Sequence, residues 1–265
     1  MNSKTLALIS VNAALYALSA YATSYIESPW GIGQFRPAIV IPFYFAMAFG
    51  PMVGGIGAAL GTFIASIFRY GQPWLTLVSG TPGNFIGFYL VGVVLYKKFT
   101  WTRFLIASLV GLLAGNITAA FGVLSAAYLG IYPPIKQISV LPISLQMAFV
   151  IGLTVFWMAT MIPFVLLIVP PLLRATKHLL PAHVSQGLGI AYSERKSLMY
   201  SLSVIGSIAL SLGLAAVFYP ELFRMGGAQA ANAIGSVFTL LGIALISSGI
   251  AVYLKMSRSV STKTW

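Results

Sequence analysis

The residues of this chain best suited to chemistry are those that could bind a small solute, and they fall in three short stretches. These read ESPWGIGQFRP at 27–37, RYGQPWLTLVSGTPGN at 69–84 and LGIYPPIKQISVLP at 129–142. Proline stiffens a loop, and Trp and Tyr offer flat contact area with a hydrogen-bonding tip. We therefore expect one pocket lined by Trp30, Gln34, Arg36, Arg69, Tyr70, Gln72, Trp74 and Lys136.

The same side chains also fit a belt of aromatic residues and long cations at a membrane surface. Two asparagines lie deeper in apolar sequence, Asn84 in TPGNFIGF and Asn116 in LAGNITAAFG. An amide in lipid needs a partner, and a hydrogen bond to another helix, worth about 1 kcal/mol, is the common solution. Contact with a substrate is the alternative, so both asparagines join the candidate substrate-binding residues.

Side chains for catalysis are scarce. The chain has no cysteine, three acidic residues (Glu27, Glu194 and Glu221) and two histidines (His178 and His183). No two carboxylates share an apolar segment, so proton transfer by an intramembrane acid has no candidate. A phosphate-binding loop with its GK[ST] signature is also absent from the sequence. We predict a protein that is not an enzyme and that holds no metal or cofactor.

Composition defines the elements that must position these residues. The chain is 59% hydrophobic and 7% charged, with mean hydropathy +0.95, so it cannot cover a water-soluble globule with polar surface. Long apolar segments without strict alternation indicate spanning helices rather than barrel strands. We predict an all-α, polytopic membrane bundle with helices at about 5–26, 37–49, 51–68, 82–96, 104–127, 145–173, 198–219 and 230–254.

The net charge of +12 is distributed in the gaps between these helices, which argues against nucleic acid as a partner. With a cytoplasmic N-terminus, the outer segments hold Arg36, Arg69, Lys136 and Arg224, and the inner ones hold the other eleven of the fifteen Lys and Arg. Cytoplasmic loops carry such an excess. We therefore expect a multi-pass protein of the cell membrane with both termini cytoplasmic, and contact with anionic membrane lipid as a by-product.

A polar segment divides the chain. We expect a six-helix membrane domain at 1–175, a cytoplasmic linker at 176–197 and a two-helix extension at 198–265. In the extension, the small residues of SLSVIGSIALSLG suit tight helix packing.

Two further stretches indicate how neighbouring helices meet. On the first helix, NAALYALSAYAT places Ala13, Ala17 and Ala20 on one face, which could pack within the bundle or meet a separate subunit. In AFGPMVGGIGAALG, at 48–61, Gly50 can end one helix in the left-handed conformation, and Pro51 suits the first turn of the next.

These features together resemble the substrate-binding S component of energy-coupling factor (ECF) transporters. The resemblance is carried by Ala13 and Ala17, by the loop with Arg36 and Pro37, by AFGPMVGGIGAALG, and by SGTPGNFIGFYLVGVVLYKK at 79–98. It covers about residues 5–175 and leaves the last two helices as an extra element.

The resemblance implies a subunit that captures a small solute such as a vitamin from outside. It also implies partners, namely a transmembrane coupling subunit that carries ATPase subunits, with the alanine face of the first helix as the docking surface. The few charges in the outer loops favour a neutral or anionic aromatic solute. The alternative is a non-catalytic scaffolding subunit that joins a larger membrane complex through the last two helices.

Overall fold

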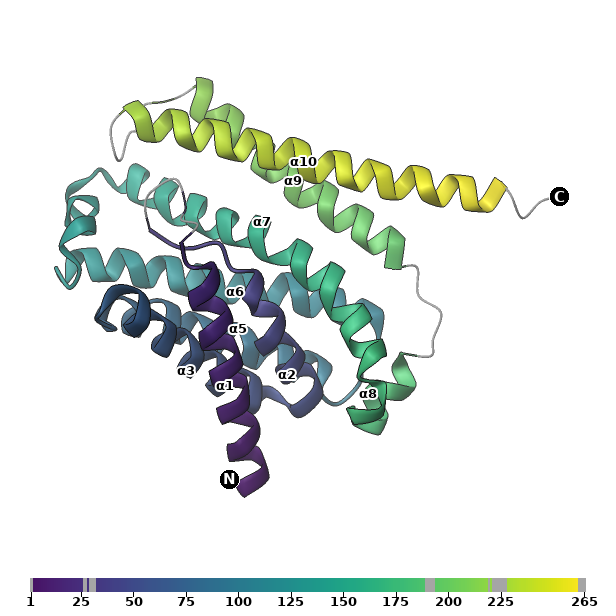
Figure 1. Ribbon diagram of the computed structural model, residues 1–265. Helices are drawn as coiled ribbons and strands as arrows, with labels where there is room; N and C mark the ends of the chain where they lie inside the picture. The colour runs from purple at the N-terminus through teal and green to yellow at the C-terminus, as the bar shows by residue number, and fades with distance from the viewer. Residues whose placement is uncertain are drawn as a thin grey trace. The chain divides into compact units, whose positions relative to one another are not determined.

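The computed structural model describes residues 2–25, 28, 32–188, 194–218, 220 and 228–261, and its regular elements are helices (Figure 1). Trp30, one of the predicted pocket residues, lies outside the described residues, as do Glu27, Glu221 and Arg224. The chain divides into two compact units, Met1–Ile190 and Ala191–Trp265, and each is described by itself.

The first unit contains most of the helices. They are α1 Ser3–Thr23, η1 Pro37–Ile39, α2 Val40–Phe49, α3 Pro51–Tyr70, α4 Trp74–Val78, α5 Gly80–Leu95, α6 Trp101–Tyr128, η2 Pro133–Val140, α7 Ile143–Ala175, η3 Lys177–Leu179 and α8 Ala182–Gly187. The second unit contains α9 Glu194–Phe218 and α10 Ala228–Ser261. A helix lies at each of the eight predicted positions, whereas the short helices α4 and α8 were not predicted.

Five helical segments in the described part of the chain are long and apolar enough to cross a membrane: α1, α3, α6, α7 and residues 232–254 of α10. The third helix, predicted at about 51–68, is longer in the structure, where α3 has 20 residues. By contrast, α2 and α5 remain shorter apolar helices of 10 and 16 residues.

The turn between α2 and α3 depends on a glycine followed by a proline. Gly50 has φ 101° and ψ 171°, so its φ is positive, as glycine allows, but its ψ is extended rather than left-handed helical. This corrects the predicted conformation of Gly50. Pro51 is the first residue of α3, where its missing N–H costs no hydrogen bond.

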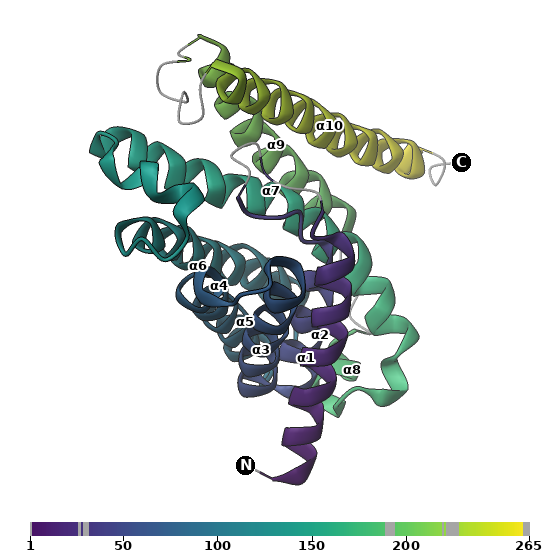
Figure 2. The ribbon, with the colours of Figure 1, turned by 60° about the vertical axis from the view of Figure 1, so that its left-hand side comes forward.

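Small residues set the distance between α1 and α3, which lie side by side (Figures 1 and 2). A Cβ on Gly57 would lie 2.3 Å from the amide nitrogen of Asn12, and one on Gly61 would lie 2.9 Å from the carbonyl oxygen of Ala13. The Asn12 amide donates to the carbonyl oxygen of Val53 at 2.9 Å. The two helices are therefore in contact along the face that also carries Tyr16.

The crossing of α5 and α6 is equally close. A Cβ on Gly83 would lie 2.6 Å from the carbonyl oxygen of Gly115, and one on Gly87 would lie 3.1 Å from that of Gly111. Side chains larger than glycine would force the helices apart. The crossing buries the neighbouring side chains Asn84 and Asn116 in the core of the first unit.

In the second unit, α9 and α10 pack against each other along glycines spaced seven residues apart. These are Gly206 and Gly213 on α9, and Gly235, Gly242 and Gly249 on α10. A Cβ on Gly213 would lie 2.4 Å from the backbone nitrogen of Thr239, and one on Gly242 would lie 2.5 Å from that of Leu210. The hairpin thus has the tight packing that the small residues of α9 predict.

Candidate functional site

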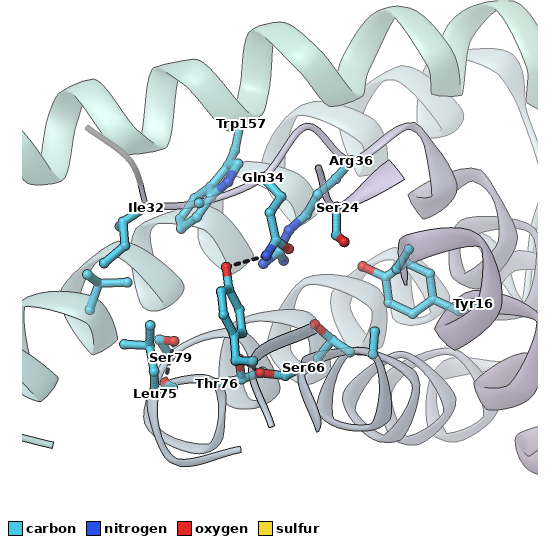
Figure 3. Close-up of a pocket in the computed structure, with 17 residues that line it drawn as sticks. Tyr16, Ser24, Ile32, Gln34, Arg36, Ser66, Leu75, Thr76, Ser79 and Trp157 are labelled. Carbon is cyan, nitrogen blue, oxygen red and sulfur yellow. Dashed lines mark hydrogen bonds between the residues drawn. The ribbon is translucent and has the colours of Figure 1, made fainter. Parts of the chain in front are cut away.

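A polar cavity of about 40 Å³ lies among the ends of several helices of the first unit (Figure 3). Its walls come from the C-terminal ends of α1 and α3, from α4, from the start of α5, from α6 and α7, and from the loop at 32–36. We call it the Arg36 pocket. At this volume it has room for about three water molecules. We call this conformation, which is too small for a vitamin-sized solute, closed.

Gly33 brings the loop at 32–36 onto α7. It has φ 82°, and a Cβ there would lie 2.8 Å from Leu153 Cδ1 and 2.8 Å from Trp157 Cζ2. The carbonyl oxygen of Gly33 accepts a hydrogen bond of 2.7 Å from the backbone N–H of Ser28. Only a residue without a side chain fits this approach, and it places Gln34 and Arg36 at the pocket.

Arg36 and Trp157 lie together at the centre of the site. The guanidinium carbon of Arg36 is 5.3 Å from the centre of the Trp157 ring, which is within the range of a cation–π contact. Trp157 is 2% exposed, and its indole N–H has no hydrogen-bond partner. Beside them, the side-chain amide of Gln34 donates to the hydroxyl of Tyr70.

Hydroxyl groups form the opposite wall, and most are already hydrogen-bonded within the protein. The hydroxyls of Ser66 and Thr76 lie 2.6 Å apart, and that of Ser79 donates to the carbonyl oxygen of Leu75 at 2.6 Å. These bonds tie α3, α4 and the start of α5 into one polar surface. The wall is therefore preorganised, while the indole N–H across from it lacks an acceptor.

A second, smaller cavity of about 10 Å³ adjoins Arg36 between α5 and α6. Asn84 and Asn116 line it, together with Met161. The Asn84 amide donates to the carbonyl oxygen of Gly80 at 2.8 Å and accepts from the hydroxyl of Tyr16 at 3.2 Å. The Asn116 amide donates to the sulfur of Met161 at 3.5 Å, and a thioether is a weak acceptor.

The structure brings together some of the predicted site residues. Gln34, Arg36 and Tyr70 line the Arg36 pocket, and Asn84 and Asn116 line the adjoining cavity with Arg36.

The other described candidates lie elsewhere. The Arg69 guanidinium lies 4.6 Å from the centre of the Tyr25 ring, and the Gln72 side chain accepts from the backbone N–H of Trp74 at 2.9 Å. Trp74 is 58% exposed and Lys136 is exposed on η2. None of these four residues is among those that line the pocket. They belong to α3, to the start of α4 and to η2.

The alanine face of α1 is occupied within the chain. Ala13 is 4% exposed and Ala17 is 3% exposed, and this side of α1 faces α3. Ala20 is half-buried and lines the Arg36 pocket. Docking of a partner on these three alanines stays a prediction, and it would require α1 and α3 to separate.

Sequence reasoning missed several pocket residues: Tyr16, Ser24, Thr62, Ser66, Thr76, Ser79 and Trp157. Two patterns could have found them. Thr62 and Ser66 are one helical turn apart on α3, and Trp157 lies in the middle of an apolar helix rather than at its end, where membrane tryptophans gather. A polar or indole group at such depth needs a partner.

Among the described residues, no group of three His, Cys, Asp or Glu side chains comes together as a metal site.

Apolar helices of membrane-spanning length, packed around a small polar pocket, define a polytopic helical membrane protein. The chain belongs to the ECF transporter substrate-specific components, whose family model matches residues 4–173. The resemblance seen in the sequence is thereby confirmed, as is the prediction of a non-catalytic subunit. A UPF0397 protein of Aliivibrio salmonicida (strain LFI1238) is 28% identical over 134 residues, which is 46% of this chain and 70% of that protein. No solved structure matches the chain significantly.

Proposed function

We propose that this chain captures a small, vitamin-like solute in the Arg36 pocket and delivers it to an ATP-driven importer. The observation that carries the proposal is the small polar pocket, in which a cation and an unpartnered indole N–H meet a wall of hydroxyl groups. A buried donor without an acceptor costs about 1 to 3 kcal/mol, and a bound solute can supply the acceptor.

The charge pattern supports an outward-facing pocket. In the first unit, Arg36, Arg69 and Lys136 belong to the segments on the pocket side, whereas the other six of its nine Lys and Arg belong to the opposite side. Lys4 and Tyr96, at the start of α1 and the end of α5, line one hollow at that opposite end. With more basic residues inside, both termini are cytoplasmic and the pocket faces out.

The proposed partner is a transmembrane coupling subunit that carries ATPase subunits. On α1 the buried alanines leave a second row of small side chains, Ala7, Ser10 and Ala14, on the exposed side. Small residues let another helix approach closely. This exposed row supports docking of α1 without any separation from α3.

The test measures solute retained by the purified protein. We expect native mass spectrometry to detect a small molecule on the wild type, or thermal unfolding to shift with at least one compound of a vitamin and nucleobase panel. Arg36→Ala should lose both signals. Arg103→Ala is the matched control, because Arg103 lies at the other end, where its guanidinium contacts the carbonyl oxygen of Val94 at 3.4 Å.

A wild type that retains nothing and responds to no compound would contradict the proposal. So would an Arg36→Ala variant that binds as the wild type does.

A scaffolding role for the second unit is the other candidate, favoured by large apolar side chains that remain exposed on α9 and α10, such as Val204 and Leu240. Deleting residues 191–265 separates the two roles. A transporter subunit should keep its solute after the deletion, whereas a scaffold should lose its place in the complex, as measured by co-purification.

A further inference from the structure

We infer that the solute of the Arg36 pocket is an aromatic carboxylate, with its carboxylate held by the guanidinium of Arg36 and the indole N–H of Trp157. This inference rests on the proposed function, and it adds the chemical class of the solute. Three observations carry it: the charge of the lining residues, the unpartnered donor and the aromatic faces.

Among the described residues that line the pocket, Arg36 is the only one with a formal charge at neutral pH, and none is acidic. Glu27 is the single acidic residue in the first 190 residues of the sequence, and it lies outside the described residues. A cation inside a membrane domain without a carboxylate beside it is costly, and an anionic solute offsets that cost. A cationic solute would raise it.

The indole N–H of Trp157 can only donate, and it has no acceptor in the closed pocket. Figure 3 shows the nitrogen edge of the ring on the side of Gln34 and Arg36. An acceptor placed between Arg36 and this N–H would receive hydrogen bonds from both. A carboxylate has two oxygens in one plane, which matches the planar donor fork of an arginine.

Three aromatic residues line the same pocket. Trp157, Tyr70 and Tyr16 line the pocket, so a flat ring has faces to pack against. The cavity of about 40 Å³ is too small for a large ligand without movement of the loop at 32–36. A planar acid needs less opening than a bulky one, which favours one ring with a carboxylate over an extended phosphorylated molecule.

The experiment compares three probes with one ring and different charge: benzoate, benzamide and benzylamine. Binding of each to the full-length detergent-solubilised protein is measured by calorimetry at pH 7. We expect benzoate to bind at least about tenfold more tightly than benzamide, and benzylamine not to bind. In parallel, the molecule retained by the purified protein is released and identified by mass spectrometry, and we expect a carboxylic acid.

Variants locate the effect. Arg36→Gln should abolish the preference for benzoate over benzamide, and Trp157→Phe, which keeps a ring but removes the N–H, should weaken benzoate about tenfold. Arg103→Gln and Trp101→Phe are the matched controls, since both residues lie at the opposite end of the unit. Both should bind benzoate as the wild type does, which shows that loss of a cation or of an indole N–H elsewhere in the unit does not weaken binding. Thermal unfolding of Arg36→Gln and Trp157→Phe reports whether these variants remain folded.

Glu27→Gln tests the acidic residue of the first 190 residues, which lies outside the described residues. The preference for benzoate should persist in this variant. If the preference appears only in Glu27→Gln, then Glu27 neutralises the site in the native chain and the inference is overturned.

The outcomes separate this inference from the proposed function. Benzamide or benzylamine binding as tightly as benzoate, or a retained solute without a carboxylate, overturns the inference alone. A retained carboxylic acid lost in Arg36→Gln supports it even where none of the three probes binds. If nothing is retained and no probe binds, both the inference and the proposed function fail.

Discussion

Replacing Gly33 with alanine tests most directly how the Arg36 pocket is built. At φ 82° an alanine is strained by about 1 to 2 kcal/mol relative to glycine. Its Cβ would also lie 2.8 Å from both Leu153 Cδ1 and Trp157 Cζ2, so α7 or the loop must shift. Overpacking of this kind costs about 1 to 3 kcal/mol. Together we expect the closed loop to lose about 2 to 5 kcal/mol.

This loss should appear in solute binding, because the loop carries Gln34 and Arg36. If the whole cost falls on the closed, solute-bound form, Kd rises about 30- to 5,000-fold. The assay is calorimetric titration of the retained solute, or of benzoate, into the purified variant. Thermal unfolding of the same sample reports whether the helices remain folded.

Gly130→Ala is the matched control. Gly130 also has a positive φ, 64°, but a Cβ there would have nothing within 4 Å. It should cost only the backbone strain of about 1 kcal/mol and leave solute affinity unchanged. If Gly33→Ala binds solute as Gly130→Ala does, the loop does not pack on α7 as described, and the structural basis of the pocket is refuted.

Three other substitutions have defined outcomes. Gly83→Leu should prevent stable folding, because a Cβ at Gly83 would already lie 2.6 Å from the carbonyl oxygen of Gly115, and a monodisperse gel-filtration peak would contradict this. Trp74→Ala should retain solute in native mass spectrometry, since Trp74 is 58% exposed. Loss of solute in this variant would indicate that Trp74 contacts the solute. Ala14→Leu should block co-purification with the coupling subunit while solute binding persists, and unimpaired assembly would exclude the exposed side of α1 as the docking face.

Much of the fold could be predicted from the sequence, because apolar runs bounded by basic or Gly/Pro segments are strong signals in a membrane chain. The Gly50–Pro51 pair divides one apolar run into α2 and α3 as expected, although ψ of Gly50 differs from the prediction. Helix α4 escaped prediction because its five residues are too few to show a period. Its start depends on the Gln72 side chain accepting from a backbone N–H, which the sequence does not reveal.

The site was only partly predictable, and the reason is geometric. Arg36 and Gln34 stood out because a basic and an amide side chain share a short loop with proline and glycine. Arg69 has the same composition around it, but its guanidinium lies over Tyr25 instead of the pocket. Trp157 lies more than 120 residues further along the chain, and only the packing of Gly33 on α7 brings it to Arg36. Composition identifies loops that can bind, whereas the direction of each side chain depends on packing between distant helices.

Arg36 lines both cavities, and under the proposed function this position would couple solute binding to movement of the loop at 32–36. Its guanidinium lines the pocket near Trp157 and also the smaller cavity with Asn84 and Asn116. Neither cavity, at about 40 Å³ and about 10 Å³, can hold a vitamin-sized solute while the loop stays closed. Under the proposed function a solute would therefore displace the loop, and its observed affinity would be reduced by the free energy of that opening. An anion bound to Arg36 would offset part of this free energy, because no described residue that lines the pocket supplies a carboxylate to the guanidinium. The same residue would then both select the solute and favour closure over it.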